Sequence, residues 1–378
     1  MRKVGLYIHI PFCIKKCAYC DFKSYENRLE YRDAYIEAAG RELSGYKDAL
    51  KGAVVDTVYI GGGTPSALSP AQIIRLGEHI RANAPVSPDA EFTFEANPDT
   101  GTREVFTAAR EAGANRVSMG LQSASDEELK TLGRLHTVKR FGESFRLARE
   151  CGFKNISLDL MTGLPGQSME SLFASADFAV SMAPEHISAY GLKIEEGTRF
   201  YEIKDSLPVP DEDTEADMYL GLTEYLSERG YRQYEISNYA KDGFYSRHNM
   251  RYWLGSEYIG IGCAAHSFFG GKRYFNAPDI EGYISAEKSG RSPVMECESL
   301  SREDMLTEHI MLRLRTVRGI RHDEFRAAFG FGFPERFKEE IEKYTSSGHM
   351  LSDGAHTSLT PGGFLLSNSI IADILLKI

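Results

Sequence analysis

The feature that most constrains the fold is a sixfold alternation of short apolar runs with longer amphipathic stretches between residues 4 and 193. The short runs are rich in β-branched and aromatic residues, as strands are, and the longer stretches have helical spacing. We expect strands at Val4–Ile10, Val54–Ile60, Glu91–Ala96, Arg116–Leu121, Asn155–Leu160 and His186–Leu192. We expect helices around Tyr31–Leu50, Pro70–Ala82, Arg103–Ala112, Val138–Cys151 and Met169–Ala183. Such repeats build a parallel sheet that is either curled into a partial or complete barrel or left open and doubly wound.

Chemically active residues follow each predicted strand, and their positions favour the barrel. They are the cysteine run Cys13–Cys20, the glycine run Gly61–Gly63, Glu95 with Asn97, Gln122, Asp159 and Lys193. In a barrel the carboxyl ends of the strands converge on one mouth, where sites of this fold lie.

The repeat stops after Lys193, and the remaining sequence predicts two further parts. Pro208–Pro210 leads into the acidic stretch Asp211–Asp217, which we interpret as a helix start because carboxylates are favoured in a first turn. A segment rich in aromatics and glycine follows, and then helical patterns at Glu303–Leu314, His322–Phe329 and Phe337–Ser346, with a hairpin-like tail. We expect a barrel over residues 1–210, an aromatic-rich α+β extension packing on it over residues 211–300, and a small helical, winged-helix-like domain over residues 301–378.

Composition and charge exclude several classes of protein. The formal net charge of −10 argues against a surface built mainly for nucleic acid. The apolar run Ile370–Ile378 is interrupted by Asp373 and Lys377 and is far shorter than the roughly 20 residues of a spanning helix. Met1–Ile10 has no cleavage site and reads as a first strand, so we expect a cytoplasmic protein. The six cysteines form no disulfide framework.

Cys13, Cys17 and Cys20 form a CxxxCxxC spacing on a loop after the first strand. Three neighbouring thiolates can bind three irons of a [4Fe–4S] cluster and leave the fourth iron without a protein ligand. Zinc is the main competitor, although structural zinc takes four ligands and no second pair of cysteines is visible. Inert buried thiols are the third interpretation; metal analysis after anaerobic purification distinguishes the three.

This arrangement resembles the radical SAM superfamily, in which an aromatic residue, here Tyr19, precedes the third cysteine. The resemblance implies that S-adenosylmethionine (SAM) chelates the open iron. It also implies that Gly61-Gly62-Gly63-Thr64-Pro65 meets the methionyl amino group, since glycine lets a charged ligand approach the backbone.

Across residues 1 to about 375 the chain resembles the HemN-like branch of that superfamily. The matching stretches are Tyr7–Cys13, Phe94–Pro98, Val117–Ser123, Leu132–Arg134 and Leu158–Leu160. The resemblance implies a partial (β/α)6 barrel, and SAM contacts at Tyr7, Tyr19, Gly62, Gly63, Thr64, Glu95, Gln122, Arg134 and Asp159. It assigns no catalytic residue beyond the cluster and the SAM site.

Within the branch the chain is most similar to the HemW haem chaperones. Phe22 stands where the oxidase HemN has a fourth cysteine, and no long segment precedes Cys13. His248-Asn249-Met250-Arg251-Tyr252-Trp253 matches the HNxxYW motif of that group, which implies His248 as a haem ligand. The glycine-rich stretch Ile259–Ser267 also resembles that group, with Ala264 in place of a usual glycine and His266 as a second-choice ligand.

The resemblance implies a haem chaperone that binds the cluster, SAM and haem, and delivers haem to apo-haemoproteins, including respiratory enzymes at the membrane. It also implies an electron donor for the cluster. The alternatives are an oxygen-independent coproporphyrinogen III oxidase or another radical SAM haem enzyme, a radical SAM methylase, for which Cys263 is the one weak candidate nucleophile, and a zinc protein.

Overall fold

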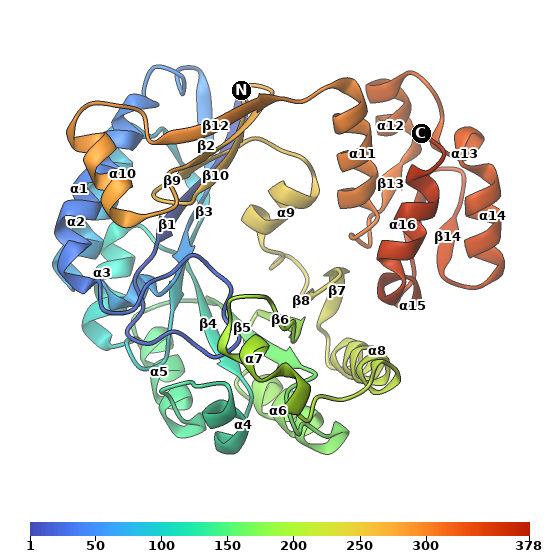
Figure 1. Cartoon of the computed structure of the whole chain (residues 1–378), viewed down its shortest axis with the longest axis horizontal. Helices are drawn as coiled ribbons and strands as arrows, with labels where there is room; N and C mark the ends of the chain where they lie inside the picture. The colour runs from blue at the N-terminus through green and yellow to red at the C-terminus, as the bar shows by residue number, and fades with distance from the viewer. The chain divides into compact units, whose positions relative to one another are not determined.

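The computed structural model describes residues 1–378, which form two compact units (Figure 1). The first unit comprises Met1–Pro210 and Glu257–Ser299, and the second comprises Asp211–Ser256 and Leu300–Ile378. The expected middle region, residues 211–300, is therefore divided between the two units. Its later part belongs with the barrel because its strands pair with the first strand of the chain.

Six neighbouring parallel strands form the centre of the first unit, in the order β1-β2-β3-β4-β5-β6. Their bounds are β1 (Arg2–Ile10), β2 (Ala53–Gly62), β3 (Val86–Ala96), β4 (Arg116–Gln122), β5 (Asn155–Thr162) and β6 (His186–Gly191). On its other side β1 pairs with a strand from the extension and not with β6, so the barrel is not closed. The predicted partial α/β barrel is confirmed.

Helices cover the outer face of this sheet (Figure 1). They are α1 (Arg32–Gly45), α2 (Pro70–Asn83), α3 (Arg103–Ala112), α4 (Asp126–Thr131), α5 (Val138–Glu150), α6 (Met169–Ser181) and α7 (Arg199–Glu202). Most begin at a Ser or Thr whose side chain accepts a hydrogen bond from the third helical N–H, as Ser69, Thr102, Thr137 and Ser168 do. These caps explain why the predicted helix starts agree closely with the structure; the sequence analysis missed only the short α4 and α7.

The extension of the first unit adds four strands beyond β1. β9 (Tyr258–Ile261) pairs parallel with β1, and β10 (His266–Phe269), β11 (Lys272–Asn276) and β12 (Val294–Ser299) continue antiparallel, with α10 (Ile280–Lys288) between the last two. The buried Glu42 of α1 joins these pieces. Its carboxylate accepts hydrogen bonds from the Gly262 N–H at 2.9 Å, the Asn276 side chain at 2.7 Å and the Tyr283 hydroxyl at 2.6 Å.

The glycine-rich stretch after β9 is shaped by contacts inside the protein. A Cβ on Gly262, at φ +105°, would lie 2.4 Å from the Tyr35 hydroxyl, and one on Gly260 would lie 2.1 Å from the His266 carbonyl oxygen. Ala264 adopts the left-handed conformation at φ +55°, which explains why glycine is usual there in the similar proteins. Close contacts within the protein therefore require glycine at positions 260 and 262.

The second unit combines helices with small antiparallel sheets. Its first part contains α8 (Glu212–Glu228), the hairpin β7 (Arg232–Glu235) and β8 (Asn238–Ala240), and α9 (Arg247–Trp253). The Asp211 side chain caps α8, which confirms the interpretation of the acidic stretch.

The C-terminal part of the second unit contains the three-stranded sheet β13-β15-β14. Its elements are α11 (Arg302–Arg313), β13 (Ile320–Arg321), α12 (His322–Phe329), α13 (Phe333–Arg336), α14 (Lys338–Ser346), β14 (Met350–Ser352), β15 (His356–Leu359), α15 (Pro361–Leu365) and α16 (Ser367–Leu375). Phe325, Phe333 and Phe337 lie at the centre of its core.

None of the helices combines the length and the apolar character that crossing a membrane requires.

Tight packing of α2 on α3 depends on a glycine and gives a stability prediction. A Cβ on Gly77 would lie 2.6 Å from Ala112 Cα, whereas a Cβ on Gly142 of α5 would meet nothing within 4 Å. We expect Gly77→Ala to lower the free energy of unfolding by about 1–3 kcal/mol through overpacking. The matched variant Gly142→Ala should raise it by about 0.5–1 kcal/mol through helix propensity. Urea unfolding of both variants tests this, and an equal effect of the two would contradict it.

Candidate functional site

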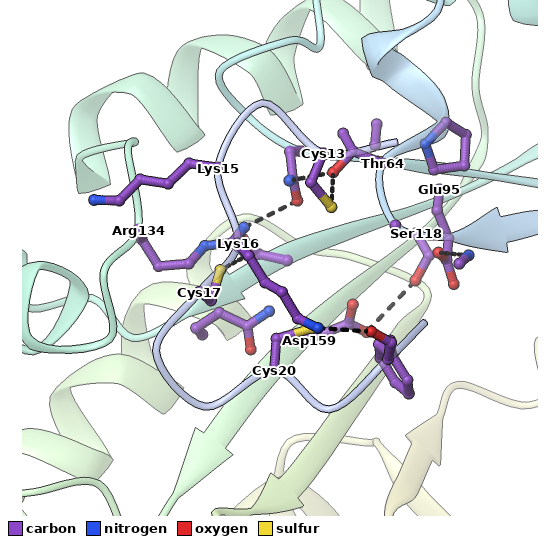
Figure 2. A pocket seen from close by; sticks show the side chains of 18 of the residues that line it. Cys13, Lys15, Lys16, Cys17, Cys20, Thr64, Glu95, Ser118, Arg134 and Asp159 are labelled. Atoms are coloured by element: carbon purple, nitrogen blue, oxygen red, sulfur yellow. Dashed lines mark hydrogen bonds between the residues drawn. The ribbon is translucent and has the colours of Figure 1, made fainter. Parts of the chain in front are cut away.

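A cleft lies at the carboxyl ends of the parallel strands and collects the residues that the sequence singled out (Figure 2). Its empty volume is about 720 Å³, which includes the open solvent at its mouth. It is lined by Cys13, Cys17 and Cys20, and by Tyr19, Gly62, Gly63, Thr64, Glu95, Gln122, Arg134 and Asp159. Every expected cluster residue and every expected SAM contact except Tyr7 is therefore in one place.

The cysteine loop is held by segments far from it in the sequence. The Cys13 N–H donates to the Tyr25 carbonyl at 3.0 Å, which ties the start of the loop to its return. Farther along, the Ala18 N–H donates to the Leu132 carbonyl at 3.0 Å, and the Ala18 carbonyl accepts from the Phe200 N–H at 2.9 Å. These backbone bonds fix the loop over the cleft without using a cysteine side chain.

All three thiols are free and have polar neighbours. The Thr64 hydroxyl donates to Cys13 Sγ at 3.5 Å, and Arg134 Nη1 donates to Cys17 Sγ at 3.5 Å. Burial raises the pKa of Cys13 and Cys20, so binding of a metal group would have to displace their protons. No three Cys, His, Asp or Glu side chains converge in a way that would hold a single metal ion.

Gly63 packs directly against the start of the cysteine loop. A Cβ on Gly63 would lie 3.0 Å from Cys13 Sγ and 2.9 Å from the Phe12 carbonyl oxygen. Only glycine permits this close approach. Three soft thiol ligands on one loop at the cleft fit an iron–sulfur cluster with an open coordination position.

The glycine run also places Glu95. Gly62 adopts a positive φ of +113°. Its N–H donates a hydrogen bond to Glu95 Oε2 at 3.1 Å. A Cβ on Gly61 would lie 2.7 Å from the Tyr59 ring and 2.9 Å from the Glu95 carboxyl group. The Tyr59 hydroxyl donates to Glu95 Oε1 at 2.6 Å, a contact that the sequence analysis did not anticipate.

The two carboxyl groups of the cleft are half-buried and have raised pKa values. Desolvation raises the pKa of Glu95 to about 7, although its hydrogen bond from Tyr59 lowers it. Desolvation also raises the pKa of Asp159, against hydrogen bonds from Ser188 and Ser118 and the charge of Arg116. The Ser118 hydroxyl donates to Asp159 Oδ1 at 3.4 Å, as Figure 2 shows. Carboxyl groups with these properties would gain most from a cationic ligand.

Arg134 provides the opposite charge at the mouth of the cleft. Its Nη2 donates to Asn97 Oδ1 at 3.0 Å and to the Gly120 carbonyl at 3.2 Å. The Asn97 amide in turn donates to the Thr64 hydroxyl at 3.0 Å, so Asn97 links the arginine to the glycine-run loop. Asn97 and Ser118 line the cleft but were not among the predicted contacts; the position of Asn97 directly after a strand was the available signal.

Tyr7 lies on the same sheet but outside the cleft lining. Its hydroxyl is 2.9 Å from His9 Nδ1, and His9 Nε2 is 2.8 Å from the Lys23 carbonyl oxygen. Tyr7 and His9 thus support the end of the cysteine loop, and a direct SAM contact of Tyr7 stays a prediction.

The two candidate haem-binding histidines differ in their surroundings. His248, on α9, is buried, and its Nε2 lies 2.9 Å from the Tyr252 hydroxyl, with the two rings edge to face. His266, on β10, is exposed and stacks on Phe275. Iron binding through His248 Nε2 would require this imidazole to give up the Tyr252 hydroxyl, and both ligand roles stay predictions.

Comparisons with known proteins match the chain in two parts and over its whole length. Residues 7–179 match the radical SAM superfamily model, and residues 300–366 match the HemN C-terminal domain. The haem chaperone HemW of Bacillus subtilis is 37% identical, over 98% of this chain and 98% of its own. HemW of Escherichia coli is 36% identical, over 97% of each chain. The solved structure of coproporphyrinogen III oxidase (HemN) from Escherichia coli, a radical SAM enzyme, shares the fold, with a TM-score of 0.87 and 22% identity over 100% of this chain and 91% of that one.

The raised pKa of Glu95 gives a prediction for the ligand-free protein. A carboxyl whose folded pKa exceeds its unfolded value contributes stability that is complete below the unfolded pKa and is lost as the pH rises through about 7. We expect Glu95→Gln to become more stable than the wild type by up to about 3 kcal/mol between pH 5 and pH 8. Urea unfolding at both pH values measures the difference, with Glu104→Gln on the exposed surface of α3 as the control. A pH dependence identical to that of the wild type would refute the assignment.

Proposed function

Because the chain belongs to the HemW family of the radical SAM superfamily, we propose that it is a haem chaperone that binds a [4Fe–4S] cluster, SAM and haem. The full-length similarity to HemW carries this proposal, since it extends through both units of the structure. Phe22 supports it, because HemN has a fourth cysteine at that position and this chain has an exposed aromatic ring there.

Cys13, Cys17 and Cys20 would hold the cluster, and the remaining cleft residues would hold SAM. When bound, the two groups would supply reductive cleavage of SAM to a carbon-centred radical. Glu95 and Asp159 accept hydrogen bonds from the ammonium group and the ribose hydroxyls of SAM, and Arg134 pairs with its carboxylate. Tyr19, Gly62, Gly63, Thr64 and Gln122 complete the contacts, with Tyr7 behind them.

The cleft residues have the right polarity for this ligand. SAM carries a sulfonium, an ammonium and a carboxylate group, and the cleft offers two carboxyl groups, one guanidinium and the ammonium groups of Lys15 and Lys16. Gly63 lies beside Cys13 Sγ without a side chain, and any Cβ there would collide with the cysteine loop.

His248 would ligate haem iron, with the aromatic side chains of its HNxxYW motif packing on the porphyrin. The acceptors would be apo-haemoproteins, including respiratory enzymes at the membrane. With a net charge of −10 the chain has no general attraction to anionic lipid, so it would reach a membrane enzyme through a protein contact. A cytoplasmic location would keep the cluster thiols reduced, and a separate electron donor would reduce the cluster.

Haem titration tests the role of His248. We expect His248→Ala to weaken haem binding by about tenfold or more and to change the Soret band, because the iron loses an axial ligand. Tyr252→Phe removes the hydroxyl that competes for Nε2 and should bind haem at least as tightly as the wild type. His266→Ala serves as the matched control; loss of binding in this variant, with His248→Ala unaffected, would move the ligand to His266.

An anaerobic assay separates the chaperone from an oxidase. With the cluster reconstituted and SAM and a reductant present, we expect no conversion of coproporphyrinogen III to protoporphyrinogen IX. Escherichia coli HemN assayed in parallel shows that the conditions support the reaction. Turnover by this chain above the level of its Cys13→Ala variant would replace the chaperone proposal with the oxidase.

A further inference from the structure

The face of the parallel sheet that forms the cleft remains polar well below the cleft floor. Side chains alternate along a strand, and paired residues on neighbouring strands share a face. The pairings Tyr7↔Tyr59, Tyr59↔Thr93, Thr93↔Arg116, Ser118↔Ser157 and Ser157↔His186 therefore define one continuous face. Its buried or half-buried titratable members are Tyr7 and His9 on β1, Tyr59 on β2, Glu91 and Glu95 on β3, Arg116 on β4, Asp159 on β5 and His186 on β6.

Arg116 is the only buried arginine or lysine on this face. It is 2% exposed, and it is the largest of the fully buried side chains. Its Nη1 donates to the Thr93 hydroxyl at 3.4 Å, whereas its Nε has no hydrogen-bond partner. A buried guanidinium with so few hydrogen bonds is costly unless nearby anions compensate it.

The nearby anions are the carboxylates of the cleft. Glu95 lies two residues beyond Thr93, the partner of Arg116, on the same face of β3. Asp159 is reached through Ser118, which lies two residues beyond Arg116 on β4 and donates to Asp159. The charge of Arg116 lowers the pKa of both carboxyl groups, against the desolvation that raises them. It also lowers the pKa of Tyr59 and His186.

Arg134 is the other arginine near the cleft, but it does not lower the pKa of both Glu95 and Asp159 as Arg116 does. Arg134 is committed to Asn97, Gly120 and Cys17 at the mouth, and it lowers the pKa of Asp159. The cation that acts on both Glu95 and Asp159 is Arg116.

We propose that Arg116 is a positioning residue of the SAM site, whose buried positive charge holds Glu95 and Asp159 as the carboxylates that receive the cationic ligand. This inference rests on the proposed SAM-binding function and adds a residue that does not touch the ligand. Without Arg116 the pKa of both carboxyl groups would rise further, which would weaken their attraction for the ammonium and sulfonium charges of SAM at neutral pH.

The pH dependence of SAM affinity tests the proposal. The cluster-loaded wild type, Arg116→Gln and Arg116→Lys would be titrated anaerobically with SAM from pH 6 to pH 9. For Arg116→Gln we expect the dissociation constant to rise about tenfold at pH 7 and to return to within about twofold of the wild type at pH 9, where the carboxyl groups ionise without help. Arg116→Lys should keep the wild-type profile. Arg149→Gln, which removes an ion pair to Glu185 at the outer surface, is the matched control.

A packing role for Arg116 would give a different result. Arg116→Gln would then weaken binding by the same factor at every pH, and Arg116→Lys would fail to rescue the profile. Either outcome overturns the proposal.

Infrared titration of the carboxyl C=O bands provides a second measurement, on protein without SAM. Comparison of the wild type with Glu95→Gln and Asp159→Asn assigns the bands, and we expect both carboxyl groups to be largely ionised at pH 8. If the band of either protonated carboxyl group persists at pH 8 in the wild type, the proposal is overturned. This measurement does not need the Arg116→Gln variant, so it remains available if that variant does not fold. If the wild type binds no SAM at any pH, the proposed function fails, while these bands still report whether the carboxyl groups are ionised.

Discussion

Strict alternation of apolar and polar side chains along the parallel strands is the constraint on which the barrel and its cleft depend. On β4, Val117, Met119 and Leu121 are fully buried on the face covered by helices, while Arg116, Ser118 and Gly120 point to the other face. A strand of an α/β protein with both faces covered by apolar layers would be almost wholly apolar. Here one face is polar, so the sheet can curl around a charged cleft and still bury enough apolar surface against its helices.

The carboxyl groups of Glu42 and Glu95 are both largely removed from bulk water, but their surroundings differ. Glu42 accepts hydrogen bonds from Gly262, Asn276 and Tyr283, so its acceptors are occupied by the protein and it joins the extension to the barrel. Glu95 receives two such bonds, from Tyr59 and Gly62, and its carboxyl group also lines the cleft. The first carboxyl group is suited to holding structure together, and the second to receiving a ligand.

In the cysteine loop, too, the groups that hold the structure are different from the groups that are free to bind a ligand. Its backbone is fixed by Tyr25, Leu132 and Phe200, which lie far apart in the sequence, so its thiols do not have to stabilise the loop. Three sulfurs thus remain available at the mouth of a polar cleft, which is what a cluster with one open iron requires. The match of residues 7–179 to the radical SAM superfamily agrees with this arrangement.

The sequence by itself determined the six strands, their helices and the three-cysteine loop, because period, caps and spacing are local properties of the chain. It also placed Glu95, Gln122 and Asp159 at strand ends, and parallel pairing brings such ends together whatever the rest of the chain does. Only the tertiary structure decided that residues 257–299 belong with the barrel, since β9 finds its partner β1 across some 250 residues. Tyr59 and Arg116 also entered the site through the structure alone, because strand register and burial, which no local pattern encodes, determine which side chains reach the carboxyl groups.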